Sequence, residues 1–155
     1  MENKFVRSIL AGVVATAVMT VFTFIAPMMG LPKMNPADML SGMLGVSPIV
    51  GWMMHFMIGI IFAAVYVYLF NPHVHIHSRA GKGLLYGFIV FVFAQIMMFI
   101  MSKMMPMPAS SMKNNMVLMM VGSLIGHLVF GMLVGLLVPI EEGATQRKEH
   151  GYKFS

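Results

Sequence analysis

The sequence of 155 residues lacks cysteine, and only 10% of its residues are Asp, Glu, Lys or Arg. Without cysteine the chain has no disulfide bond, no thiolate metal ligand and no cysteine nucleophile. A soluble domain carries about 25% charged residues. At 59% hydrophobic residues the chain is also too apolar for a small soluble globule, because much of such a globule is surface. The composition therefore excludes a disordered regulator and argues strongly against a soluble enzyme.

The chain also lacks the common motifs of catalysis and of nucleic-acid binding. It has no P-loop, no serine-hydrolase elbow, no HExxH zinc motif and no paired carboxylates inside its apolar segments. Its basic residues form no stripe with interleaved aromatic residues, so nucleic acid is not an expected partner. We expect a protein that is not an enzyme.

Four apolar segments each reach the roughly 20 residues that cross a bilayer. They cover about residues 6–29, 48–70, 83–102 and 117–139, and their interiors contain no Asp, Glu, Lys or Arg. Each should be a helix, because a segment in lipid must satisfy its own backbone hydrogen bonds. The predicted fold is all-α, a transmembrane four-helix bundle forming a single integral membrane domain over residues 1–155, with residues 140–155 as a cytoplasmic tail.

The basic residues that flank these segments predict the orientation. Seven of them fall on one side of the membrane and three on the other, in the groups Lys4, Arg7, Arg79, Lys82, Arg147, Lys148 and Lys153 against Lys33, Lys103 and Lys113. By the positive-inside rule, both termini lie in the cytoplasm. We expect a multi-pass protein of a bacterial inner membrane, surrounded by the lipid bilayer.

The connections carry two further signals. In the first outer loop, Asn35 before Pro36 is typical of a helix start and Gly45 of a helix end, which predicts a short helix on the outer interface. The inner loop, from Asn71 to Lys82, holds His73, His75 and His77 at alternate positions. In an extended strand these three imidazoles would share one side and could bind a metal, although a solvated linker is the simpler interpretation.

The two halves of the chain resemble each other. The second and fourth segments both read small residue, His, Gly, small residue at steps of four, in the runs Gly51, His55, Gly59, Ala63 and Ser123, His127, Gly131, Gly135. The offset is 72 residues for this pair, and 75 residues for the pair Ser8, Gly12, Thr16, Thr20 and Gly83, Gly87, Phe91, Gln95. The pattern predicts two parallel two-helix repeats whose small faces let helices approach closely. The face of Gly83 and Gly87 could also join two copies in a homodimer.

Inside the segments, the strongly polar residues fall at one depth. Counted at about 1.5 Å per residue from the outer ends, His55, His127, Gln95 and Thr20 form one layer in the outer leaflet. Ionisable residues in a membrane are candidate functional sites. One interpretation is a hydrogen-bonded core that fixes the register of the helices. A second is a haem b held by His55 and His127, with Gly59 and Gly131 making room for the macrocycle.

A third interpretation is a metal site of imidazole and thioether ligands. Beside the two histidines, its candidate ligands are Met19, Met57, Met98 and Met119. The chain has 21 methionines, and 19 of them fall in the outer loops or the outer halves of the segments. Thioethers select soft ions, so this asymmetry points to copper. The alternative is a flexible contact surface, by which a non-catalytic accessory subunit would pack on a larger membrane complex.

Three motifs together resemble a family of small bacterial four-span membrane proteins without an assigned activity. They are Ala26-Pro27-Met28-Met29-Gly30-Leu31-Pro32, Gly51-Trp52-x2-His55-Phe56 and Gly126-His127-Leu128. The resemblance covers nearly the whole chain. It implies the fold and the membrane location, and it implies no mechanism.

Overall fold

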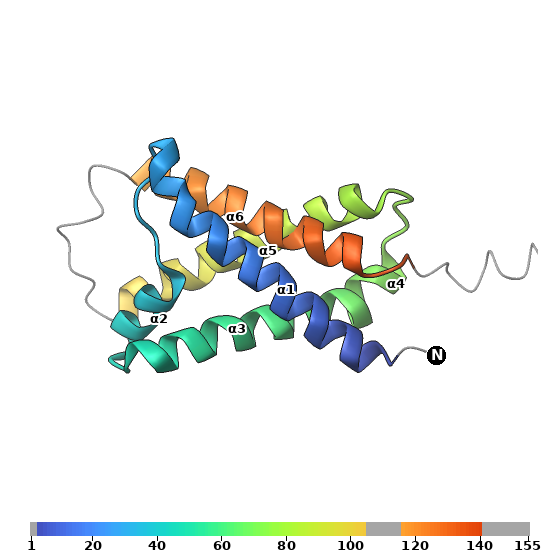
Figure 1. Cartoon of the computed structure of the whole chain (residues 1–155), viewed down its shortest axis with the longest axis horizontal. Helices are drawn as coiled ribbons and strands as arrows, with labels where there is room; N and C mark the ends of the chain where they lie inside the picture. Colours follow the sequence, from blue (N-terminus) through green and yellow to red (C-terminus); the bar gives the residue numbers. More distant parts are fainter. Residues whose placement is uncertain (1–2, 105–115, 141–155) are drawn as a thin grey trace, which may run out of the picture.

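The computed structural model of the chain describes residues 3–104 and 116–140. These residues form a bundle of long helices with one short helix at one end (Figure 1). The elements are α1 (Lys4–Ile25), η1 (Ala26–Met29), α2 (Pro36–Leu44), α3 (Pro48–Val65), η2 (Tyr66–Phe70), α4 (Asn71–His73), α5 (Arg79–Met104) and α6 (Met116–Leu137). The prediction of an all-α bundle is confirmed.

Four helical stretches are long and apolar enough to cross a membrane. They are Lys4–Met29, Pro48–His73, Arg79–Met104 and Met116–Leu137, and each overlaps one of the predicted segments. The second stretch is continuous through the π-helical turn η2 and α4. Large apolar side chains cover the outside of the bundle, as a multi-pass membrane protein requires in lipid.

The short helix α2 forms where the sequence predicts it. The Asn35 side chain caps the helix by accepting from the amides of Ala37 and Asp38, and Gly45 ends it in the left-handed conformation with φ 65°. Ala37 and Ser41 are buried, and α2 packs on α3 at a position where Gly51 has no side chain to obstruct the Ala37 carbonyl. The end of the bundle at α2 is called the α2 end below.

The predicted repeat is visible in how the helices pair. In the first half α1 packs on α3, where a Cβ added to Gly12 would come within 3.1 Å of the Gly59 carbonyl. In the second half α5 packs on α6, and the equivalent residues Gly87 and Gly131 lie against each other. The face of Gly83 and Gly87, which could have joined two copies in a homodimer, is occupied by α6 of the same chain.

The two contacts between the halves differ. α1 packs along α6, whereas α3 and α5 are not among the closely packed helix pairs of the described residues. Large side chains bridge α3 and α5 instead. The Tyr86 hydroxyl donates to the Phe62 carbonyl at 2.6 Å, and the rings of Phe62 and Phe93 lie 5.6 Å apart.

A buried lysine ties the helices together at the end opposite α2, called the Lys82 end below. Lys82 is 0% exposed, and its ammonium donates to the backbone and side-chain oxygens of Asn71 at 2.6 and 2.7 Å. The Asn71 amide in turn donates to the Pro139 carbonyl at 2.9 Å. The sequence treats Lys82 as a flanking charge, so this role was missed.

The predicted inner loop is shorter than expected. It was expected over residues 71–82, but α4 continues to His73 and α5 begins at Arg79. His73 lies in a helix, with its Nδ1 2.6 Å from the Leu69 carbonyl, so the three histidines of this connection do not share one extended strand. Residues 105–115, which connect α5 to α6, and the predicted tail from Glu141 lie outside the described residues.

Candidate functional site

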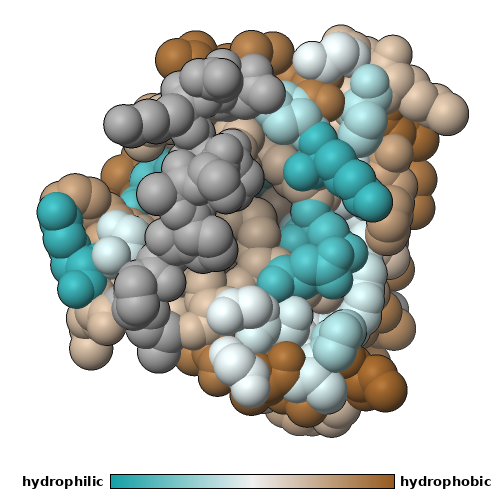
Figure 2. Space-filling model, turned by 90° about the vertical axis from the view of Figure 1, so that its left-hand side faces the viewer, coloured by the Kyte–Doolittle hydropathy of each residue, from teal (hydrophilic) through white to brown (hydrophobic). Residues whose placement is uncertain are grey.

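A large cavity lies where α3 and α5 part. It has a volume of about 870 Å³ and is lined by residues of α1, α2, α3, α5 and α6. Besides Tyr86, its polar lining residues are Thr16, Thr23, His55, Gln95, Ser123 and His127. No Asp, Glu, Lys or Arg of the described chain lines it. Figure 2 views the molecule from the α2 end, where hydrophilic residues lie beside the centre and at one edge, and strongly apolar residues lie at the top and bottom of the view.

His55 is held on the α1 side of the cavity. It is 8% exposed, and its Nε2 lies 3.1 Å from the Thr20 hydroxyl oxygen. That hydroxyl already donates its proton to the Thr16 carbonyl at 2.8 Å, so in this contact Nε2–H donates and the hydroxyl accepts. The lone pair of a neutral His55 therefore lies on Nδ1.

His127 has the opposite tautomer. Its Nδ1 lies 2.7 Å from the Ser123 carbonyl, which can only accept, so Nδ1 carries the proton and Nε2 the lone pair. The Gln95 amide donates to the Ser123 hydroxyl at 3.3 Å, which links α5 to the same turn of α6. The Phe91 ring lies 6.0 Å from the imidazole and packs edge-on against it.

The predicted polar layer is thus built twice, once by each repeat. Thr20 and His55 are in contact in the first half, and their equivalents Gln95 and His127 share Ser123 as a partner in the second. Both histidines line the same cavity. Each imidazole donates one hydrogen bond to the protein and keeps one basic nitrogen, an arrangement that suits a ligand with an empty orbital or a proton to share.

Methionines dominate the rest of the lining. The ten are Met19, Met34, Met39, Met43, Met97, Met98, Met101, Met116, Met119 and Met120. Of the predicted thioether ligands, Met19, Met98 and Met119 are among them. Met57 is 53% exposed and does not line the cavity. The other lining methionines belong to the outer group that the sequence singles out, although they were not predicted as ligands.

The two glycines expected beside the histidines have different surroundings. Gly59 lines the cavity, and a Cβ added there would overlap the Thr16 hydroxyl. Gly131 faces the backbone of Gly83 and Gly87. Gly131 therefore lets α6 pack closely on α5. The haem interpretation needs open space beside Gly131, and α5 fills that space.

The described residues contain no group of three His, Cys, Asp or Glu side chains that could hold a metal ion. His75 and His77 lie in the exposed connection after α4, apart from the cavity. Among residues 3–104 and 116–140, the richest set of possible metal donors is that of the thioethers and the two imidazoles around the cavity.

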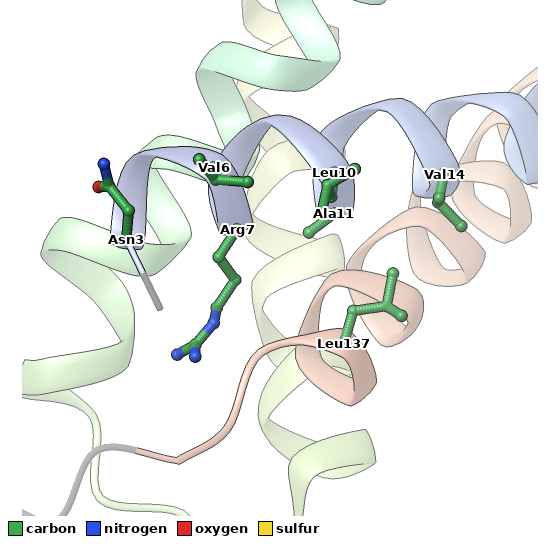
Figure 3. Close-up of a pocket in the computed structure, with 7 residues that line it drawn as sticks. All are labelled: Asn3, Val6, Arg7, Leu10, Ala11, Val14 and Leu137. Atoms are coloured by element: carbon green, nitrogen blue, oxygen red, sulfur yellow. The ribbon is translucent and has the colours of Figure 1, made fainter. Parts of the chain in front are cut away.

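A second, smaller hollow lies at the Lys82 end, between α1 and α6 (Figure 3). It has a volume of about 330 Å³ and is walled mainly by aliphatic residues, among them Leu10, Val14 and Leu137. The Arg7 side chain extends from α1 on the side where α6 ends. This hollow contains none of the predicted site residues.

Comparison with known proteins places the chain in a family. Residues 2–149 match a family of unknown function, DUF6789. The chain belongs to this family. The resemblance to a family without an assigned activity is thereby confirmed. No protein of curated function and no solved structure shows a significant match.

Proposed function

We propose that this multi-pass membrane protein binds copper(I) in the methionine-lined cavity. The observation that carries the proposal is that ten thioethers and two imidazoles surround one space without any charged side chain among the described residues. Thioethers and imidazoles are soft or intermediate donors and favour a monovalent soft ion. A divalent ion would find no carboxylate to offset its charge in this apolar surrounding.

The geometry favours copper over haem b. Haem ligation by both histidines would require a free nitrogen from each pointing at one iron. The Nε2 of His55 is engaged by Thr20, and the backbone of α5 fills the space beside Gly131. A copper ion needs no such space. It can be reached by flexible methionine side chains from several helices.

The route of the ion follows from the proposed orientation. If both termini lie in the cytoplasm of a bacterium, the methionines of α2 and of the outer ends of α5 and α6 face the periplasm. Copper would then enter at the α2 end. Towards the Lys82 end the cavity is bounded by Phe62, Tyr86 and Phe130. This arrangement supports acquisition or sensing of the ion from one side.

Competition with a chromophoric copper(I) chelator tests the proposal on protein purified in detergent without oxygen. Met98→Leu and Met119→Leu keep the side-chain volume and remove a sulfur from the lining. We expect each to weaken copper(I) binding by about tenfold, equivalent to ~1.4 kcal/mol. Met57→Leu is the matched control and should leave the affinity unchanged, because Met57 lies outside the cavity.

Two results would overturn the copper proposal. The first is a protein that binds no copper(I) above the level of the detergent blank. The second is an equal loss in all three methionine variants. Absorbance distinguishes haem b: a Soret band that disappears in His55→Ala and His127→Ala would replace copper with haem.

The second candidate is a non-catalytic accessory subunit of a larger membrane complex. The parted α3–α5 contact favours it, because exposed apolar residues line both of its edges, among them Ile61, Ile89 and Phe93. Another protein's membrane helix could pack there. Photo-cross-linkers at these positions, with Leu10 on α1 as the control, should then yield one defined cross-linked partner in native membranes.

A further inference from the structure

The smaller hollow at the Lys82 end runs along one face of α1. Four of its lining residues lie at the helical spacing i, i+3, i+4 and i+7, namely Arg7, Leu10, Ala11 and Val14. Arg7 lies one turn from the start of α1, and Val14 lies two turns further in. At about 1.5 Å per residue, these seven residues span roughly 10 Å. The hollow is therefore elongated in the direction in which α1 would cross a membrane.

The lining of the hollow changes from polar to apolar along this direction. Asn3 and Arg7 line its outer end, and Leu10, Val14 and Leu137 lie further in (Figure 3). The last three side chains are 60%, 43% and 46% exposed, so the inner part of the hollow is open to the surroundings of the bundle. In a membrane these surroundings are lipid chains, and a chain could lie against the three residues without leaving the bilayer.

The described part of the Lys82 end is positively charged. Lys4, Arg7, Arg79 and Lys82 lie there, at or near the starts of α1 and α5. Of the residues that the structure describes, Asp38 is the one acidic residue, and it lies in α2 at the opposite end; the other four acidic residues of the sequence fall outside the described ranges. No described residue that lines the hollow offers a carboxylate or an aromatic ring to a choline or ammonium group. The hollow therefore favours a ligand with a net negative charge.

We propose that the hollow binds an acidic phospholipid, with its phosphodiester at Arg7 and one acyl chain along Leu10, Val14 and Leu137. A guanidinium has five N–H donors in a planar fork and forms paired hydrogen bonds to phosphate oxygens. Basic pockets between membrane helices bind the head groups of acidic lipids. Charge at the end of the helix and aliphatic side chains further in follow the order of head group and chain in a bilayer leaflet. The phospholipid site is independent of the copper site, because no methionine or histidine is among the described residues that line the hollow.

Native mass spectrometry of the full-length protein, purified in detergent without copper, tests the proposal. The protein is offered equal amounts of phosphatidylglycerol and phosphatidylcholine with the same acyl chains. Phosphatidylglycerol should be retained about fivefold more, which corresponds to ~1 kcal/mol for one basic residue. An excess of glycerophosphoglycerol, the head group without acyl chains, should not displace the lipid.

One pair of substitutions tests the charged end of the hollow. Arg7→Gln removes the charge and should abolish the preference for phosphatidylglycerol. Arg79→Gln is the matched control, because Arg79 is exposed at the same end of the bundle and does not line the hollow. In thermal unfolding, added phosphatidylglycerol should raise the Tm of the wild type and of Arg79→Gln, and it should not raise that of Arg7→Gln.

A second pair tests the apolar part of the hollow. Val14 and Val13 are exposed to similar extents, 43% and 38%, but only Val14 lines the hollow. The phenyl ring of Val14→Phe should occupy the path of the acyl chain and lower the retention of phosphatidylglycerol several-fold. Val13→Phe adds the same ring outside the hollow and should leave the retention unchanged. This pair also decides the matter if Arg7→Gln does not fold, which gel filtration shows.

Four results would overturn the proposal. They are equal retention of the two lipids by the wild type, equal effects of Arg7→Gln and Arg79→Gln, equal effects of Val14→Phe and Val13→Phe, and displacement of the lipid by glycerophosphoglycerol. The last would show that the head group binds without the chain. Copper(I) binding is measured on separate samples, so failure of the phospholipid site and failure of the copper site are distinguishable.

Discussion

The two contacts between the repeats, α1 with α6 and α3 with α5, are equivalent in sequence and different in structure. The first is closed along the helices, and the second is parted and bounds the cavity. Within each repeat, by contrast, the helices meet in the same way, with Gly12 at Gly59 and Gly87 at Gly131. The internal glycine pattern sets the packing inside a repeat, and other residues decide how the repeats join.

Residue size at equivalent positions explains the difference. With the offsets of 75 and 72 residues, Ala11 of α1 corresponds to Tyr86 of α5, and Val134 of α6 corresponds to Phe62 of α3. Ala11 and Val134 are fully buried members of the core, and their small volumes let α1 approach α6. Tyr86 and Phe62 occupy the same places in the other contact and hold α5 and α3 apart. An asymmetry of side-chain volume thus opens a cavity on one side of a symmetric pair of repeats.

The largest effect is expected when a tyrosine, the residue of the parted contact, is placed in the closed α1–α6 contact. Ala11→Tyr puts a phenol where the side chain is 1% exposed. Overpacking of a filled core costs about 1–3 kcal/mol and sometimes more, and this substitution adds a whole ring. We expect a loss of at least ~3 kcal/mol in the free energy of unfolding, measured by thermal unfolding in detergent.

Leu10→Tyr is the matched control for that variant, since Leu10 is the neighbouring residue and is 60% exposed. It should change the stability little. A stable Ala11→Tyr protein would show that α1 and α6 can part as easily as α3 and α5, and the size argument would fail.

The next largest loss of stability is expected from substituting a glycine that packs within a repeat, compared with a glycine that faces the other repeat. Gly131→Ala would overlap the backbone of α5 at Gly83 and Gly87, which cannot yield, so we expect a loss of about 1–3 kcal/mol. Gly126→Ala, on the same helix but facing α1, would meet the flexible end of Met19 at 3.4 Å and should cost less. Thermal unfolding of the two variants measures the difference. Equal losses would contradict the assignment of Gly131 to a backbone contact.

The sequence predicts much of the fold because lipid restricts the alternatives to a few. Long apolar runs must be helices, and Asn35 and Gly45 bound α2. The spaced glycines indicate that helices approach closely, but they do not say which helices pair. The spacing of small residues did not predict that the α3–α5 contact would be parted and the α1–α6 contact closed. That difference depends on the side-chain volumes of residues such as Tyr86. The candidate site was likewise predicted only in part. The depth of His55 and His127 follows from counting along helices, whereas the direction of Met57 depends on a rotation about the helix axis that counting does not supply.

A smaller effect is expected from loosening the bridge across the parted contact. Tyr86→Phe removes the hydrogen bond to the Phe62 carbonyl and should lower the free energy of unfolding by about 1 kcal/mol. The chain has no cysteine, so spin labels can be placed freely. Labels at Met53 and Ile100 should report a broader α3–α5 distance distribution by pulsed electron paramagnetic resonance. An unchanged distribution would mean that the bridge does not set the width of the opening.

The smallest expected effect is a difference between the α3–α5 and α1–α6 contacts in how their distance distributions respond to copper(I). Thioethers of α5 and α6 and the His55 imidazole of α3 line the cavity, so an ion bound among them should hold α3 and α5 in fewer arrangements relative to each other. The label pair Met53 and Ile100 spans the parted contact, and its distance distribution should narrow on addition of copper(I). A pair at Val21 and Leu118, which spans α1 and α6, should not respond, because that contact is already closed. If the distance distributions of both label pairs narrow alike, copper(I) stiffens the whole bundle. If only that of Met53 and Ile100 narrows, the ion binds at the α3–α5 contact, where the large residues keep the repeats apart.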